Sequence, residues 1–216
     1  MTVEVWWAEV GAARDEFLAD LDQVELERFA AYKRIVDNRR FLLGVTIVRR
    51  VLAARFSLPA ASIRLDRTCP ECGKPHGKVR ADGVELSVTH SGELVGVAFA
   101  DRPVGLDVEK VDPELDVDAV ARVAFAADDV RALSRRTGID KVRAFTEQWT
   151  RMEAALKATG EGLRGVRQRA PDGIQVVQLD VGEDHRAALA VVSAEPPVVH
   201  VRDASGLLSS GSDPHP

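Results

Sequence analysis

Signals for strands and helices occur in the same order twice along this chain, and this repeated order constrains its fold more than any other feature. Each half begins with a short apolar strand, continues with helices and ends with strands, and the change between halves falls near residues 101–103. Such an order is typical of α+β proteins. The sequence therefore predicts an α+β fold of two similar α/β halves stacked as a pseudo-twofold pair, with the ligand cleft at the seam.

The expected elements set the boundaries of the two halves. Apolar side chains recur every three or four positions in residues 37–56, which predicts a helix with Asp37 as its N-cap. Further helices are expected at residues 15–31, 117–125, 128–136 and 140–159, and strands at residues 3–10, 62–66, 84–90, 94–100, 104–109, 174–181, 187–192 and 198–201. The halves are then residues 1–101 and 102–202, and residues 203–216 form a disordered tail.

The charge distribution limits the class of ligand. The 216-residue chain carries a net charge of −5, which disfavours general nucleic-acid binding. Residues 28–55 nevertheless contain eight basic residues and a single acidic one, Asp37. This segment predicts either one local anionic ligand or a solvated helix face whose charges are balanced from elsewhere in the fold.

Two carboxylates stand two residues apart in the apolar strand Val104–Glu109. Side chains two apart on a strand share a face, so Asp107 and Glu109 point the same way. Two like charges in an apolar strand are costly unless a cation compensates them, and Mg²⁺ prefers such oxygen ligands. The pattern predicts either a magnesium site or a strand end whose carboxylates face water.

A second pair of charges lies in the helix expected at residues 140–159. Glu153 and Lys157 are four residues apart and therefore neighbours on one helical face, with Trp149 four residues before Glu153 on the same side. The simplest interpretation is an ordinary salt bridge on a solvated helix. The flanking residues are mostly apolar, however, and Gly160 and Gly162 allow a ligand to approach the backbone closely, so a functional pair is also predicted.

The two cysteines raise the question of a zinc site, and the absence of targeting signals indicates the cellular compartment. Cys69 and Cys72, with His76 nearby, could form half of a zinc site that would have to borrow a ligand such as His90. Two reduced thiols in a loop are the simpler interpretation. The sequence shows no signal peptide and no apolar run long enough to span a membrane, so we expect a cytoplasmic protein.

Taken together, these motifs resemble those of the 4′-phosphopantetheinyl transferases, specifically the larger, monomeric, surfactin-synthetase-activating type. The resemblance spans roughly residues 25–165, with every element in the expected order. It rests on the strand Val104–Glu109, the helix Trp149–Lys157 with Gly160–Leu163, the turn Thr89–Ser91, the weaker element Gly77–Val79 and the basic helical segment Arg40–Gly44.

The resemblance implies an activity and a set of partners. Members of this family transfer the phosphopantetheine arm of coenzyme A to a serine hydroxyl of an acyl or peptidyl carrier protein and release adenosine 3′,5′-bisphosphate. They require Mg²⁺ or Mn²⁺. The carrier could belong to a fatty-acid, polyketide or peptide synthetase, and the region 117–133 is the expected docking surface. Neither nucleic acid nor a membrane is expected as a partner.

The same resemblance implies roles for individual residues. Asp107, Glu109 and Glu153 would hold the metal ion, and Glu153 would accept the proton of the carrier serine, directly or through a metal-bound water. Lys157 would stabilise or protonate the leaving phosphate. The coenzyme A contacts would come from Arg28, Arg40, Lys78, Thr89, His90 and Lys157, with His90 bonding a phosphate oxygen.

Three positions depart from the family pattern. Met152 replaces a lysine next to the helix glutamate, Thr89 replaces a serine before the histidine, and Val79 replaces a proline. Alternative interpretations are a Mg²⁺-dependent nucleotide or pyrophosphate hydrolase, a non-catalytic module that binds coenzyme A or a carrier protein, and a zinc-ribbon nucleic-acid binder.

Overall fold

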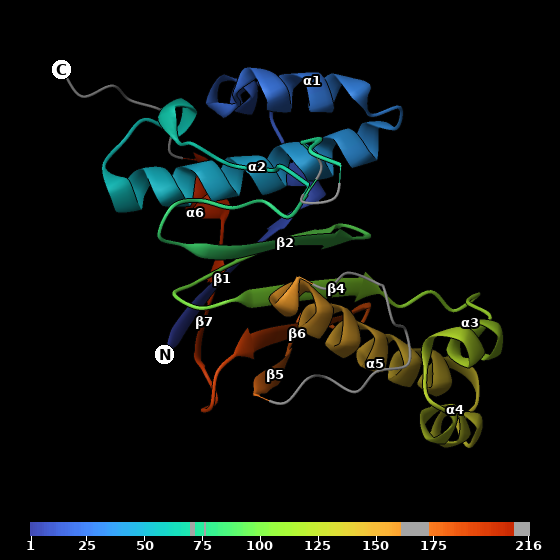
Figure 1. Ribbon diagram of the computed structural model, residues 1–216. Helices are drawn as coiled ribbons and strands as arrows, with labels where there is room; N and C mark the ends of the chain where they lie inside the picture. Colours follow the sequence, from blue (N-terminus) through green and yellow to red (C-terminus); the bar gives the residue numbers. More distant parts are fainter. Residues whose placement is uncertain (70–71, 76, 161–172, 210–216) are drawn as a thin grey trace. The chain divides into compact units, whose positions relative to one another are not determined.

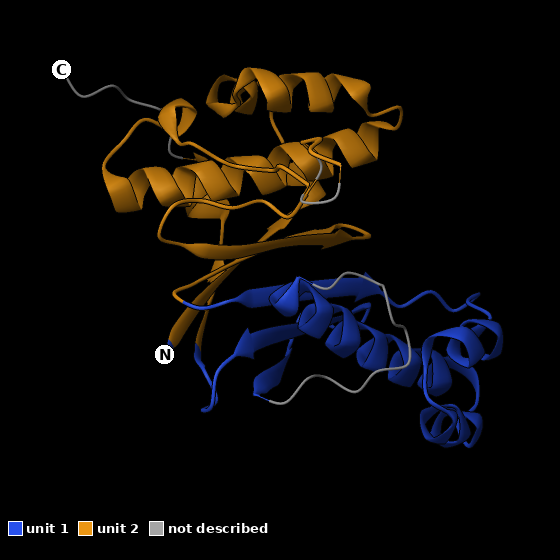
Figure 2. Cartoon of the chain, viewed as in Figure 1, with its two compact units in different colours: residues 1, 102–198 blue, residues 2–101, 199–216 orange. Residues whose placement is uncertain are grey.

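The computed structural model describes residues 1–69, 72–75, 77–160 and 173–209. It divides into two compact units, unit 1 with residues 1 and 102–198 and unit 2 with residues 2–101 and 199–216 (Figure 2). Each unit contains a β-sheet and one helix of 22 residues that packs on it (Figure 1). The mixed α+β class predicted from the sequence is therefore confirmed.

Unit 2 is built on a four-stranded sheet. Its strands are β1 (Thr2–Glu9), β2 (Glu85–Ser91), β3 (Leu94–Ala100) and β7 (Val198–Asp203), in the order β2-β3-β1-β7. The helix α2 (Ile35–Phe56) packs against this sheet. At Gly44 an added Cβ would lie 3.0 Å from Val88 Cγ1, so the glycine lets the helix approach β2 closely.

The helices of unit 2 begin at residues other than those expected. The stretch expected as one helix over residues 15–31 is a 3₁₀ helix (Asp15–Asp20) followed by α1 (Gln23–Ala31). The break arises because Asp22 forms a capping box with Glu25 and so starts a new helix. Asp37 is not an N-cap: α2 begins at Ile35, and Asp37 lies in its first turn, where Arg40 binds it at 3.0 Å.

The basic segment of residues 28–55 is largely neutralised inside unit 2. The Arg49 side chain is fully buried and donates at 2.6 Å to both Asp22 and Glu25, and at 3.0 Å to the carbonyls of Ala60 and Ile63. Further along α2, Arg50 pairs with Asp20 and Arg55 with Glu4. Carboxylates from elsewhere in the fold therefore balance Arg49, Arg50 and Arg55, as one of the two interpretations of this basic segment predicted.

Unit 1 is built on a three-stranded antiparallel sheet. Its strands are β4 (Val104–Lys110), β5 (Ile174–Leu179) and β6 (His185–Val192), in the order β4-β6-β5. The helices are α3 (Val117–Ala124), α4 (Ala127–Ser134) and α5 (Gly138–Thr159). Small side chains let α5 lie close to the sheet, because Ala154, Ala155 and Ala158 pack against Ala188 and Ala190.

The end of the described chain differs from the expected disordered tail. Asp203 is the last residue of β7, and α6 (Ser205–Ser209) follows it directly. Ala204 and Leu208 are buried against the apolar core of unit 2, which explains the order of this segment. Residues 210–216 lie outside the described part. The strand expected at residues 62–66 is reduced to one bridge between Asp66 and Arg80.

No helix among the described residues combines the length and the apolar character that crossing a membrane requires.

Candidate functional site

The face of β4 that carries the two motif carboxylates is turned toward α5. A Cβ atom added to Gly105 would overlap the carbonyl oxygen of Ala154 and lie 2.5 Å from the backbone nitrogen of Ala158. Because side chains alternate along a strand, Asp107 and Glu109 share this α5-facing side. The Asp107 carboxylate is buried, whereas Glu109 is partly exposed. The glycine of the motif is therefore what allows helix and strand to meet beside the carboxylates.

Lys157 of α5 binds the buried carboxylate of β4. Its ammonium donates to Asp107 Oδ1 at 2.6 Å and to the carbonyl oxygen of Leu106 at 3.2 Å. The Asp107 side chain is 5% exposed and the Lys157 side chain 32% exposed, so the pair lies at the edge of the core. Lys157 therefore bonds to the strand, a contact that the sequence did not indicate, while its predicted ion pair with Glu153 along the helix stays a prediction.

Glu153 lies one helical turn before Lys157, and the charges of both Lys157 and Asp107 act on its carboxyl group. Burial raises the pKa of the Glu153 carboxyl above its usual range, the charge of Asp107 raises it further, and the charge of Lys157 opposes both. A carboxyl with a raised pKa is a better proton acceptor when ionised. The structure thus brings Asp107, Glu153 and Lys157 together into one cluster within unit 1.

The expected metal ligands Asp107, Glu109 and Glu153 all belong to β4 and α5. Among the described residues, no three His, Cys, Asp or Glu side chains are placed closely enough to hold a metal ion. The repulsion between Asp107 and Glu153, both oxygen donors, is nevertheless of the kind that a hard divalent cation relieves. The donor chemistry fits Mg²⁺ or Mn²⁺, and the assignment of Asp107, Glu109 and Glu153 as ligands stays a prediction.

The motif tryptophan has a packing role in unit 1. Trp149 lies 5.9 Å from Phe145 in a stacked arrangement and 6.4 Å from Phe125, measured between ring centroids. This aromatic group joins the segment after α3 to α5. Met152, at the position where a lysine is expected, packs partly buried against the same apolar cluster. The missing positive charge is thus replaced by an apolar contact.

Five of the six residues predicted to bind coenzyme A lie in unit 2, whereas Lys157 lies in unit 1. Three of the five belong to the hairpin of β2 and β3 or contact it. Thr89 and His90 are neighbours on β2, with Thr89 buried and His90 exposed. The Arg40 guanidinium donates to the carbonyl oxygen of Gly92 in the hairpin turn, at 3.0 Å from Nε and 2.6 Å from Nη2. Arg40 therefore links α2 to the turn after His90 through hydrogen bonds.

The other two predicted coenzyme A residues lie on α1 and on the loop before β2. Arg28 stands over the ring of Phe41 at 5.2 Å and donates to the carbonyl oxygen of Pro75 at 3.1 Å. Burial lowers the pKa of the Lys78 ammonium, with the charge of Glu85 opposing this effect. A positive charge kept partly out of water interacts more strongly with an anion.

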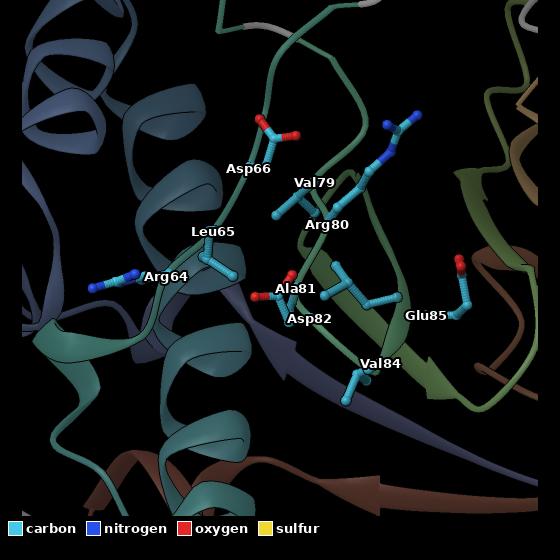
Figure 3. Close-up of a pocket in the computed structure, with 11 residues that line it drawn as sticks. Arg64, Leu65, Asp66, Val79, Arg80, Ala81, Asp82, Val84 and Glu85 are labelled. Atoms are coloured by element: carbon cyan, nitrogen blue, oxygen red, sulfur yellow. The ribbon is translucent and has the colours of Figure 1, made fainter.

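A cavity of about 470 Å³ lies in unit 2 between residues 64–66 and 79–86 (Figure 3). Its charged side chains do not converge: Arg64 points to one side of the view, while Asp66 and Arg80 point upward. This divergence is unlike a small-molecule site, in which a few polar groups aim at one ligand. We therefore place the candidate site at the cluster of Asp107, Glu153 and Lys157.

Some residues of the predicted motifs lie outside the part of the chain that the structure describes. Glu161, Gly162, Leu163 and His76 lie outside the described residues. Gly160 ends α5 in a left-handed conformation, as a C-terminal glycine often does. The zinc alternative for Cys69 and Cys72 gains no support from the described residues, since none of them form a group of three metal-binding side chains.

Comparison with known proteins places this geometry in a family. Residues 103–201 match the model of the 4′-phosphopantetheinyl transferase superfamily. The chain is 30% identical to the 4′-phosphopantetheinyl transferase psf-1 of Bacillus pumilus over 179 residues, which cover 82% of this chain and 72% of that protein. The chain belongs to the 4′-phosphopantetheinyl transferase family.

Other transferases are similar over comparable lengths. A phosphopantetheinyl transferase of Thraustochytrium sp. is 29% identical over 207 residues, which cover 84% of this chain and 71% of that protein. The 4′-phosphopantetheinyl transferase Sfp of Bacillus subtilis is 27% identical over 150 residues, 69% of this chain and 64% of that protein. The resemblance inferred from the motifs is thus confirmed, and the chain is an enzyme of the phosphopantetheinyl transferase class.

Sequence reasoning missed two residues that shape the two units. Gly105 was noted only as part of a motif, although an apolar strand with an isolated glycine signals a close backbone approach. Arg49 belongs to the basic segment predicted to meet an anion, although Val45 and Leu52, four residues before it and three after it on the helix, face the core.

Proposed function

We propose that this transferase moves the 4′-phosphopantetheine arm of coenzyme A to a serine hydroxyl of an acyl or peptidyl carrier protein and releases adenosine 3′,5′-bisphosphate. The observation that carries the proposal is the cluster in unit 1. It holds a carboxyl with a raised pKa, Glu153, beside a lysine bound to a buried carboxylate, Lys157 to Asp107. A proton acceptor and a cation side by side suit an attack on phosphorus.

The two helix residues have complementary roles in the proposed reaction. Glu153 accepts the proton of the carrier serine, so that the serine oxygen can form its bond to the phosphorus. The bond from phosphorus to the adenosine bisphosphate then breaks, and Lys157 stabilises the negative charge that develops on the departing phosphate. Lys157 can also donate a proton there, because its ammonium is held at the cluster by Asp107 and Leu106.

A divalent ion belongs to the proposal through Asp107, Glu109 and Glu153. These three residues would hold Mg²⁺ or Mn²⁺, which when bound neutralises the charge of the diphosphate. The support is chemical. All three residues are carboxylates and therefore oxygen donors, and the charge of Asp107 contributes to the raised pKa of Glu153. In the absence of the ion, Lys157 compensates the buried Asp107 charge.

Coenzyme A recognition is proposed for the residues of unit 2. Arg28 and Lys78 would bind the adenosine end and its 3′-phosphate, and His90 and Thr89 a phosphate oxygen. Arg40 would support them chiefly by holding the hairpin turn at Gly92. A ligand cleft at the seam of two pseudo-twofold halves, a monomeric state and a cytoplasmic location remain predictions from the sequence.

The experiment that tests the proposal combines the protein with coenzyme A, Mg²⁺ and a panel of apo-carriers from fatty-acid, polyketide and peptide synthetases. The expected result is that at least one carrier gains the mass of a single phosphopantetheine group and that its serine-to-alanine variant gains none. Release of adenosine 3′,5′-bisphosphate at the same rate without any carrier would instead identify a hydrolase and overturn the proposal.

A further inference from the structure

Unit 1 contains a cavity of about 390 Å³ that the proposed transfer does not use. It is bounded by the end of α4, the first half of α5 and the start of β6, elements that can be followed in Figure 1. Its charged lining residues are the arginines Arg136, Arg143, Arg151 and Arg186 and the acids Asp140 and Glu147. Four positive and two negative side chains leave this cavity with a formal charge of +2, in a chain whose net charge is −5.

The cavity is lined by α5 residues that precede the candidate catalytic cluster along the helix. Arg143, Glu147 and Arg151 follow one another at intervals of four residues and therefore share one helical face. Glu153 and Lys157 come ten and 14 residues after Arg143, rotations of about 80° and 40° around the helix axis from that arginine. A ligand at Arg143 would thus be separated from Glu153 and Lys157 along the helix axis, toward the N-terminus of α5.

The arginines of the cavity differ from those of α2 in their ion pairs with the described residues. Within residues 102–160 and 173–198, the part of unit 1 that can be described, Arg136, Arg143, Arg151 and Arg186 form no salt bridge. The arginines of α2 in unit 2 behave differently, since Arg40, Arg49 and Arg50 each bind a carboxylate within 3.0 Å. The presence of four arginines in the lining of this cavity therefore lacks the structural explanation that applies to α2.

Two of the four guanidinium groups are partly withdrawn from water. The Nε atom of Arg143 is buried, and no described residue accepts a hydrogen bond from it. Arg186 donates from Nη1 to the carbonyl oxygens of Glu183 at 3.2 Å and His185 at 2.6 Å, which fixes its position. A buried donor without an acceptor costs free energy that a bound acceptor would recover.

We propose that this cavity is a binding site for a small phosphate-bearing anion, lined by residues other than those assigned to coenzyme A. Phosphate matches both the charge and the geometry, because a dianion balances the excess of two positive charges and an arginine fork binds it through paired hydrogen bonds. The volume is at the lower end of the range for small-molecule sites, so a phosphate monoester is a better fit than a large nucleotide. The site does not depend on the transferase activity.

The test measures binding of inorganic phosphate, and of glycerol 1-phosphate as a monoester, to the full chain in metal-free buffer. The readouts are calorimetry and the NMR resonance of the Arg143 Nε–H group. We expect the Arg143 resonance to shift on saturation, and the double variant Arg143→Gln/Arg151→Gln to bind at least about 10-fold more weakly. Tighter binding of the monoester would identify an organic phosphate as the ligand, and equal binding would identify free phosphate.

The matched control is Arg122→Gln, which removes an exposed arginine of α3 outside the cavity and should bind both probes like the wild type. Absence of binding to the wild-type chain would overturn the inference. So would equal affinity of the wild type and the double variant, because phosphate would then be bound at another group of cations. Transfer to a carrier is measured separately and should be unchanged in the double variant, so failure of one proposal leaves the other intact.

Discussion

The ammonium of Lys157 on α5 lies 2.6 Å from the Asp107 carboxylate on β4, and this bond ties the helix to the strand at the candidate site. It gives one lysine two tasks. It compensates a buried negative charge in the resting protein, and in the proposed reaction it stabilises the leaving phosphate. The site therefore depends on a residue whose loss should affect catalysis more than ligand binding.

Replacing Lys157 separates these tasks. We expect Lys157→Ala to lower turnover by about 100-fold or more while the KM for coenzyme A changes far less, because the lost interaction belongs to the leaving group. Lys157→Arg, which keeps the positive charge, should recover part of the turnover. Steady-state kinetics with a carrier substrate give both constants. A rise in KM with an unchanged turnover would make Lys157 a ground-state anchor for coenzyme A instead.

The raised pKa of Glu153 predicts a definite pH dependence of stability. Its carboxyl titrates above the ordinary value of 4.5 in the folded chain, so ionisation of Glu153 opposes folding. The protonated Glu153 carboxyl stabilises the folded chain. This contribution to the free energy of unfolding is complete below pH 4.5 and is lost as the pH rises through the higher folded-state pKa. Glu153→Gln should remove this loss, and the variant should gain stability relative to the wild type across that interval in metal-free buffer.

Urea unfolding at a series of pH values gives the difference in the free energy of unfolding between the two proteins. A carbon-13 NMR titration of the Glu153 carboxyl measures the pKa itself. A titration midpoint at or below 4.5 in the wild type would show that neither burial nor Asp107 acts on this group as described.

Gly105 should not tolerate a side chain. In Gly105→Ala the new methyl group would overlap the Ala154 carbonyl and push α5 away from β4. We expect the free energy of unfolding to fall by about 1–3 kcal/mol, the usual cost of overpacking a core. Gly11→Ala is the control, because nothing lies within 4 Å of a Cβ added there. Equal thermal midpoints for the two variants would contradict the close approach of strand and helix.

The buried Arg49 is expected to be the most sensitive charged residue of unit 2. Arg49→Met leaves the carboxylates of Asp22 and Glu25 without their main cation, which typically costs about 3–5 kcal/mol of stability. Arg39→Met changes an exposed arginine of the same helix and should cost less than about 0.5 kcal/mol. Chemical denaturation compares the two variants, and similar losses for both would show that the network contributes little.

The sequence predicted which strand and which helix carry the motif residues better than it predicted where the helices begin. The spacing of Asp107 and Glu109 on a strand, and of Glu153 and Lys157 on a helix, depends only on local periodicity, so their placement on β4 and α5 could be anticipated. The bond between Lys157 and Asp107 could not, because it joins residues 50 positions apart and depends on how closely α5 packs on the sheet.

The charged network of unit 2 and the C-terminal segment illustrate the same limit. Arg49 binds carboxylates 24 and 27 residues away, so a local count of charges cannot show that it is neutralised. The segment Ser205–Ser209 is rich in small and polar residues, which predicts disorder, yet Leu208 finds a place in the core of unit 2. Tertiary contacts of this kind have no signature in the local sequence.

Manganese binding tests the central claim most directly, because the claim is that Asp107 and Glu153 share one divalent cation. We predict that calorimetry detects one Mn²⁺ site in the wild type, and that Asp107→Ala, while still folded by circular dichroism, loses both this site and metal-dependent transfer to a carrier. Glu114→Ala, an exposed carboxylate beyond β4, should bind Mn²⁺ like the wild type. Wild-type Mn²⁺ affinity and wild-type transfer rates in Asp107→Ala would contradict the account.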